Sequence, residues 1–150
     1  MDFNRFTERT QQSIKDAQRL AISLGHSAVD VEHVFKALLD QENGIVPKIL
    51  QRMEVPLDRF KPLAQNELEK KPRVSGPGYD PEKIILSQAL SALLVKAEET
   101  AKKLKDEYVS VEHVFLEIIR TGTTTPSGRI LREFNVTEER FLEGLAALRG

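Results

Sequence analysis

The stretch Val31-Glu32-His33-Val34-Phe35 occurs twice in this chain, returning unchanged eighty positions later as Val111-Glu112-His113-Val114-Phe115. The residues around it keep the same offset, since Thr7 corresponds to Ser87 and Asp30 corresponds to Ser110. A chance recurrence of five residues is improbable in a chain of 150. The sequence therefore predicts an internal duplication.

Helical spacing is present in both copies. Thr7, Asp30, Ser87 and Ser110 are residue types that cap helix N-termini, and each precedes a helical pattern. Asp80 is a second possible start for the fifth helix, but the repeat favours Ser87 because it matches Thr7. One residue inserted in the loop 122–126 changes the later offset to 81. At that offset the residues Ile49, Leu50, Val55, Arg59 and Phe60 recur as Ile130, Leu131, Val136, Arg140 and Phe141.

The predicted fold is all-α, with eight helices in two four-helix repeats and no sheet. Repeat one takes about residues 1–70, a Pro- and Gly-rich linker about 71–86, and repeat two about 87–150. We expect the fourth helix at about 58–69, with Asp58 as its cap and with Pro62 tolerable only within about the first turn. Two copies are too few for an open solenoid, so they should pack about a pseudo-twofold axis as one domain.

Composition narrows the function classes. Hydrophobic residues make up 40% and charged residues 30%, as in ordinary globular proteins. Residues 1–75 hold 12 Lys and Arg against 11 Asp and Glu, and the rest holds 10 against 12, so no basic half points to nucleic acid. The chain has no cysteine, and no run approaches the ~20 apolar residues of a membrane span. We expect a cytoplasmic monomer that binds neither nucleic acid nor membrane.

The repeated Glu-His pair resembles a catalytic or metal-binding motif, but its context argues against both. The chain has three histidines, no His-Glu-x-x-His, no nucleophile elbow and no phosphate-binding glycine loop. The histidines are better explained as hydrogen-bonded packing residues. A glutamate in the first turn of a helix suits the helix dipole, yet its recurrence leaves a functional role for Glu32 and Glu112 open. Lys70-Lys71 is interpreted as two charges at the negative end of a helix dipole.

Several segments resemble a known family, the amino-terminal repeat domain of Clp ATPases. They are Phe6-Thr7-Glu8-Arg9, Leu24-Gly25-His26, Val31-Glu32-His33, the linker 74–78 and the stretch from Leu104 to His113. The linker and the last stretch are most similar to the ClpB disaggregases, and the opening segments are also similar to the sister family ClpC. Glu117 departs from the family pattern, which more often continues with apolar residues at that point.

The resemblance implies a non-enzymatic domain that recruits unfolded or aggregated polypeptide for a hexameric AAA+ ring working with a DnaK-type chaperone system. The domain itself would need no cofactor, since ATP and Mg²⁺ belong to the ring. Residues matching positions implicated in substrate binding in ClpB relatives are Thr7, Asp106 and Glu112, and Glu32 is the first-copy counterpart of Glu112.

Three hypotheses follow. The leading one is a module that captures exposed apolar polypeptide in a shallow groove, with Thr7 and the carboxylates at its rim. The second is a ClpC-like adaptor-binding or phosphoarginine-binding module, in which Glu32 and Glu112 hold guanidinium groups. The third, from another class, is a metal-dependent hydrolase that uses the histidines.

Overall fold

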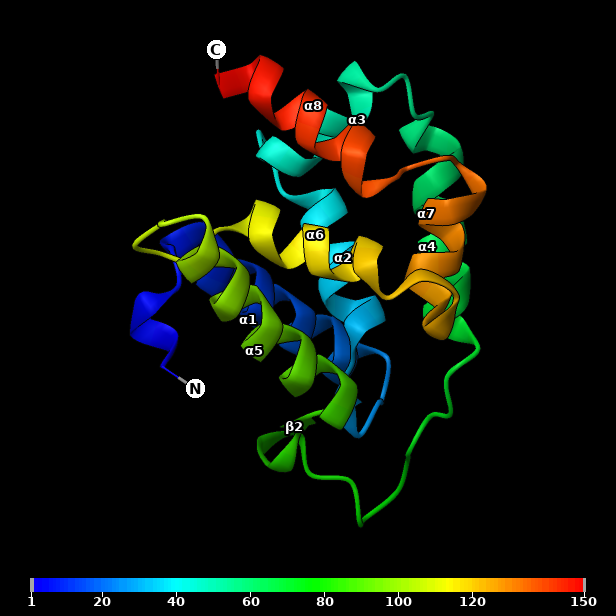
Figure 1. Cartoon of the computed structure of the whole chain (residues 1–150). Coiled ribbons are helices and arrows are strands. Elements are labelled where there is room, and N and C mark those ends of the chain that lie inside the picture. The colour runs from blue at the N-terminus through cyan, green and yellow to red at the C-terminus, as the bar shows by residue number, and fades with distance from the viewer. Residues whose placement is uncertain (1, 150) are drawn as a thin grey trace.

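A computed structural model describes residues 2–149 and confirms the all-α prediction, with eight α-helices in this range (Figure 1). The elements follow in order as η1 (Phe3–Arg5), α1 (Glu8–Ser23), β1 (Ala28–Val29), α2 (Val31–Asp40), α3 (Ile45–Arg52), α4 (Leu57–Glu69), η2 (Pro81–Lys83), β2 (Ile85–Leu86), α5 (Gln88–Lys103), α6 (Val111–Arg120), η3 (Gly122–Thr124), α7 (Pro126–Glu133) and α8 (Glu138–Arg149). No helix within residues 2–149 has the length and apolar character needed to cross a membrane.

The predicted caps begin both long helices. Thr7 Oγ1 accepts a hydrogen bond from the Thr10 N–H at 3.2 Å, and Ser87 Oγ accepts one from the Leu90 N–H at 3.0 Å. The prediction that α5 starts at Ser87 is therefore confirmed. Asp80 instead caps η2, where its side chain accepts from the Glu82 N–H at 3.0 Å.

The start of α4 differs from the prediction. This helix begins at Leu57, because the Pro56 carbonyl already accepts from the Arg59 and Phe60 N–H groups at 3.0 Å. Asp58 is thus not the cap but lies in the first turn. Pro62 lies in the second turn, so its tolerance extends further than expected. The proline ring lacks the N–H that would reach the Asp58 carbonyl, and α4 accommodates this loss of one internal hydrogen bond.

The two repeats exchange partners at their helix starts. The residues β1 and β2 form a two-residue parallel pair, with Val29 opposite Leu86. A second parallel bridge joins Phe6 to Val109. At the offset of 80, Phe6 corresponds to Leu86 and Val109 to Val29, so this bridge is the repeat-related copy of the first one. The prediction of no sheet is therefore wrong for this one two-residue pair. A strand of two residues is too short to produce an alternating pattern in the sequence. As a result, the segment before α5 lies against α2, and the segment before α1 lies against α6.

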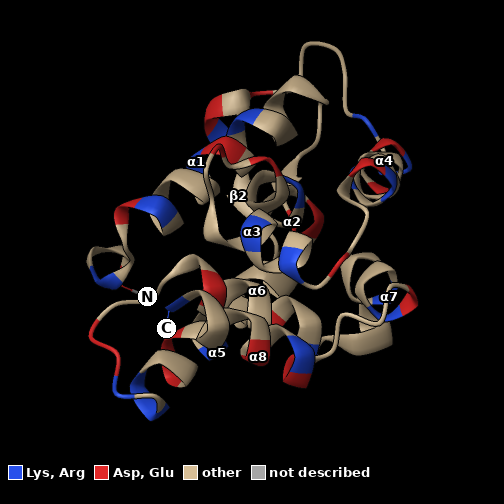
Figure 2. Ribbon diagram, turned by 90° about the horizontal axis from the view of Figure 1, so that it is seen from above, with Lys and Arg blue, Asp and Glu red and all other residues tan. Residues whose placement is uncertain are grey.

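The core lies across the pseudo-twofold axis. Helix α2 packs against α6, α3 against α8 and α4 against α7. The repeat relates α2 to α6, α3 to α7 and α4 to α8, so a twofold axis between the copies turns each of these contacts into itself or into another of the three. Phe35 of α2 stacks on Phe115 of α6, with ring centroids 5.9 Å apart. Phe60 packs beside Phe35 and its counterpart Phe141 beside Phe115, at 5.7 and 5.2 Å. All four rings are fully buried. Basic and acidic residues are interspersed along the surrounding helices (Figure 2).

The C-terminal end of α5 offers a stabilising substitution. Lys105 has φ of 59°, in the left-handed region, whereas its counterpart after α1 is Gly25 with φ of 71°. Lys105→Gly is expected to raise the free energy of unfolding by about 0.5–1 kcal/mol, because relief of the side-chain strain exceeds the added entropy of the unfolded chain. Urea unfolding at pH 7 measures the change. Lys96→Gly, at an exposed position in the middle of α5, is the control and should lower stability by about 0.5–1 kcal/mol. A loss of stability in both variants would contradict the prediction.

Candidate functional site

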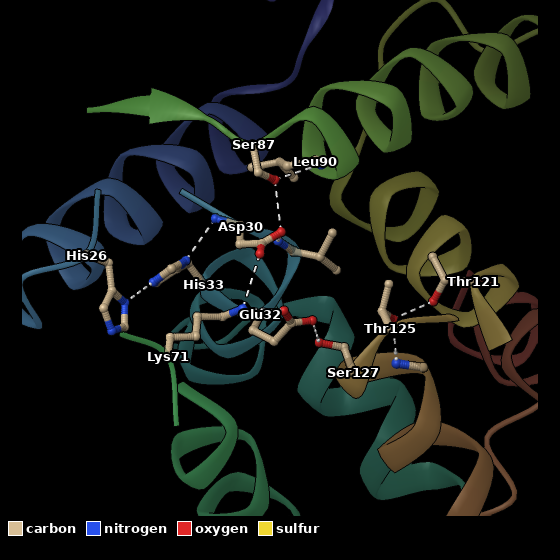
Figure 3. A network of polar contacts seen from close by, with 12 residues as sticks. His26, Asp30, Glu32, His33, Lys71, Ser87, Leu90, Thr121, Thr125 and Ser127 are labelled. Carbon is tan, nitrogen blue, oxygen red and sulfur yellow. Dashed lines mark hydrogen bonds and ion pairs between the residues drawn. The ribbon is translucent and has the colours of Figure 1, made fainter. Parts of the chain in front are cut away.

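Two related clusters form where the copies exchange partners. The first-repeat site surrounds the start of α2 and consists of Asp30, Glu32, Lys71, Ser87 and Ser127 (Figure 3). The second-repeat site surrounds the start of α6 and consists of Thr7, Asp106, Ser110, Glu112 and Arg149. Each site combines residues from both copies, because the cap of α5 approaches α2 and the cap of α1 approaches α6.

In each repeat a histidine side chain accepts a hydrogen bond from the backbone at the start of the helix. The Asp30 N–H donates to His33 Nδ1 at 2.8 Å, and the Ser110 N–H donates to His113 Nδ1 at 2.9 Å. This is the arrangement of a capping box, with histidine in place of the usual Glu or Gln at the third helical position. Both rings are buried. The interpretation of the histidines as hydrogen-bonded packing residues is confirmed, and the repeated motif thereby acquires a structural reason.

The first-repeat site is a partly buried ionic network around the buried carboxylate of Glu32. Glu32 is 3% exposed, its Oε1 lies 2.9 Å from Lys71 Nζ, and its Oε2 accepts from Ser127 Oγ at 2.9 Å. Asp30 Oδ2 also lies 3.1 Å from Lys71 Nζ, while Ser87 Oγ donates to Asp30 Oδ1 at 2.8 Å. Burial opposes the charge on Lys71, but its hydrogen bond to Glu32 and the charges of Glu32 and Asp30 outweigh burial and raise its pKa.

The second-repeat site brings together Thr7, Asp106 and Glu112. The Thr7 N–H donates to the Val109 carbonyl at 3.0 Å, directly before the start of α6. Asp106 Oδ2 accepts from His113 Nε2 at 2.8 Å. Glu112 forms an ion pair with Arg149 at the end of α8. The three predicted residues therefore surround one helix start, and Glu32 lies at the other.

Two expectations about the charged residues need correction. Glu32 and Glu112 do not stand at an open rim, since they are 3% and 6% exposed and each is paired with a cation. Lys71 does not act on the dipole of α4 but reaches the carboxylates of the first-repeat site, as Figure 3 shows. The sequence contains no signal for these pairings, because both cations come from segments far along the chain from their partners.

The buried Glu117, which departs from the family pattern, is also bonded to neighbouring side chains. It is 6% exposed, and its Oε2 accepts from Thr100 Oγ1 at 2.8 Å and lies 2.6 Å from Arg120 Nη1. A carboxylate is tolerated in this buried position because both neighbours satisfy it. Among residues 2–149 no three His, Asp or Glu side chains are grouped so as to hold a metal ion. The hydrolase hypothesis therefore finds no ligand set in this part of the chain.

The histidine pair of the first repeat makes stability depend on pH. His33 Nδ1 accepts from the backbone, so its Nε2–H donates to His26 Nδ1, at 2.8 Å. Burial, with the charges of His26 and Lys71, lowers the pKa of His33 to about 4, although the charge of Asp30 opposes this. Burial, Lys71 and Arg73 lower the pKa of His26. Both histidines are therefore neutral in the folded protein at pH 7. A proton on His26 Nδ1 would break the hydrogen bond between the two rings, and a proton on His33 Nδ1 would break its bond from the Asp30 N–H.

The contribution of the two neutral histidines to the free energy of unfolding should be fully present above pH 6.5, the ordinary pKa of histidine. It should decline as the pH falls towards about 4. We expect a loss of roughly 2 to 3 kcal/mol over that range, measured by urea unfolding at several pH values. His26→Asp is the control, because it reproduces the Asp106–His113 pair of the second repeat and should favour a charged His33. The variant should show a smaller loss. Equal losses in the two proteins would contradict this assignment.

Two comparisons with known proteins show the family. The sequence model of the Clp repeat (R) N-terminal domain matches residues 5–134. The chaperone protein ClpB of Nitratidesulfovibrio vulgaris is 46% identical over 150 residues, and the match covers 100% of this chain and 17% of that protein. The chain thus spans about a sixth of the length of such a curated relative.

Solved structures of low identity share the fold. The Hsp104 N-terminal domain from Candida albicans has a TM-score of 0.80 at 21% identity, covering 97% of this chain and 91% of that one. A complex of a ClpV N-domain with a VipB peptide has a TM-score of 0.72 at 18% identity, covering 91% of this chain and 82% of that one.

Proposed function

Since this chain belongs to the Clp repeat N-terminal domain family, we propose that it recruits unfolded or aggregated polypeptide for a ClpB-type ATP-dependent disaggregase. In this proposal the domain binds and does not catalyse. ATP and Mg²⁺ act in a hexameric ring elsewhere in a longer cytoplasmic protein, together with a DnaK-type chaperone system. The peptide complex of a ClpV N-domain supports peptide binding as a property of this fold.

An apolar groove along α1, between η1 and β2, is the observation that carries the proposal. The groove has a volume of about 270 Å³ and is lined by Phe3, Gln11, Ile14, Lys15, Gln18 and Leu86. Phe3 is 40% exposed, and Ile85 beside Leu86 is 67% exposed. Exposed apolar side chains around one groove are typical of a surface that binds protein.

The groove and Thr7 are joined by hydrogen bonds. Gln11 in the first turns of α1 donates to the Phe3 and Phe6 carbonyls at 3.2 and 2.9 Å. Phe6 in turn pairs with Val109, next to the start of α6. The Phe3 end of the groove is therefore connected to the segment that precedes Thr7, while the Leu86 end directly precedes Ser87. The groove is shallow and small, so it suits single apolar side chains of many sequences and predicts weak, sequence-tolerant binding.

Paired substitutions test the assignment to the second repeat. Thr7→Ala and Ser87→Ala each remove a helix cap at corresponding positions and should each cost at least ~1 kcal/mol of stability, although Ser87→Ala also removes the hydrogen bond to Asp30. We expect Thr7→Ala, alone and with Glu112→Gln, to weaken binding of a permanently unfolded, reduced and carboxymethylated protein several-fold. Ser87→Ala should leave that affinity unchanged. Fluorescence anisotropy at fixed ionic strength measures both, and an equal effect of the two alanines would refute the assignment.

The phosphoarginine reader is the second candidate, because Glu32 and Glu112 each already hold a cationic side chain. In this alternative, a guanidinium group would replace Lys71 or Arg149, and backbone N–H groups at the helix start would bind the phosphate. Calorimetry with phosphoarginine and with arginine separates the candidates. A heat specific to phosphoarginine would favour the reader, and equal or absent heats would exclude it.

A further inference from the structure

Each repeat places a cation from its own C-terminal end on the glutamate of its second helix. Lys71, just after α4, pairs with Glu32, and Arg149, at the end of α8, pairs with Glu112. The two glutamates correspond under the repeat but the two cations do not, since the offset of 81 matches Arg149 with Leu68. Each glutamate is therefore paired with a cation of its own, and the two ion pairs can be compared.

The first-repeat pair is closed. The Lys71 side chain is 23% exposed and contacts the carboxylates of both Asp30 and Glu32. The chain after it is also held, because the Val74 N–H donates to the Gly25 carbonyl at 2.7 Å. Withdrawal of Lys71 would leave two carboxylates without their cation, so this pair is expected to remain in place.

The second-repeat pair can open. The Arg149 side chain is 52% exposed and contacts the carboxylate of Glu112 alone. Because the half-exposed arginine recovers its hydration when it leaves, opening this pair costs less than opening the first-repeat pair. The Glu112 side chain is 8% exposed and would be left without its cation, so a second cation at the same place would restore the pairing.

We propose that Arg149 is a removable plug of the second-repeat site, which competes with a basic side chain of the incoming polypeptide for Glu112. This inference rests on the proposed function and concerns its regulation and specificity. The exchange replaces one cation by another at a nearly buried carboxylate, so the net pairing of Glu112 is unchanged. Polypeptides with Arg or Lys beside an apolar segment are therefore preferred over acidic ones, while the first-repeat site stays closed by Lys71.

Arg149→Ala tests the plug with a simple probe, the N-acetyl amide of arginine, titrated by NMR. Competition from an exposed ion pair reduces the apparent affinity by roughly two- to sixfold, so removal of the plug should raise affinity for the probe by that factor. Arg52→Ala in α3 is the control, because it removes the same net charge at an exposed position. Glu112→Gln should abolish the gain when combined with Arg149→Ala.

Equal affinities of the wild type and Arg149→Ala, or an equal gain in Arg52→Ala, would overturn the plug. A parallel titration with the unfolded protein separates this failure from failure of the proposed function. If the unfolded protein binds both proteins equally, the function stands and the plug is wrong. If it binds neither, the function is wrong and the plug regulates nothing. A tighter complex with Arg149→Ala, lost again with Glu112→Gln, supports both.

Discussion

Lys71→Ala is expected to lower the free energy of unfolding by about 3 kcal/mol, the low end for breaking a buried ion pair. The reason is that Glu32 and Asp30 would keep their charges while losing the one cation that contacts both. Glu32 cannot recover hydration, since its side chain is 4% exposed. Urea unfolding at pH 7, followed by circular dichroism, measures the loss.

Two variants control the interpretation. Arg149→Ala removes the cation of the second-repeat site and should cost less than Lys71→Ala, because that arginine is half exposed and pairs with one carboxylate instead of two. Adding Glu32→Gln to Lys71→Ala removes a stranded charge and should recover part of the lost stability. If Lys71→Ala and Arg149→Ala cost the same, the distinction between a closed and an openable site is lost.

Phe115→Ala is expected to cost about 3 to 5 kcal/mol, the range for deleting a fully buried aromatic ring. Phe115 stacks on Phe35 across the pseudo-twofold axis and also contacts Phe141, so its loss opens a cavity between the repeats. Phe35→Ala should cost a similar amount. A double-mutant cycle should show coupling of roughly 0.5–1.5 kcal/mol between the two rings.

Phe3→Ala is the control for ring deletion, because Phe3 is 40% exposed and is not one of the four buried rings between the repeats. It should cost less than about 1.5 kcal/mol and should instead weaken polypeptide binding in the groove. Additive effects of the Phe35 and Phe115 variants, with no coupling, would show that the two repeats do not share one core at this point.

The order and number of the helices could be predicted because the information is local or duplicated. Thr7 and Ser87 each cap a helix by accepting a hydrogen bond from the N–H three residues later. The match of Ser87 to Thr7 in the repeat favoured Ser87 over Asp80 as the start of α5. The start of α4 was predicted wrongly because the prediction followed the capping preference of Asp58, although the offset of 81 matches Pro56 with Thr137, the residue before α8. The carbonyl of Pro56 begins α4 before Asp58 can cap it.

The site was only partly predictable, because its geometry depends on how the copies exchange partners. Thr7 and Glu112 lie at one helix start since Phe6 pairs with Val109, a contact over a hundred residues that no periodicity reveals. The same applies to the pairing of Glu32 with Lys71 and of Glu112 with Arg149. A helical pattern shows which face a residue takes, but not which distant segment covers that face.

The most direct test of the account is an NMR titration of ¹⁵N-labelled protein with an unfolded polypeptide, since it shows where the polypeptide binds. We predict that the largest shift changes occur at the amides of Thr7, Gln11, Ile14 and Glu112, along the groove and the second-repeat site. The amides of Glu32 and Ser127 should change little. Largest changes around Glu32 and Ser127, or on the surface formed by α3 and α8, would contradict the claim that the second repeat carries the binding site.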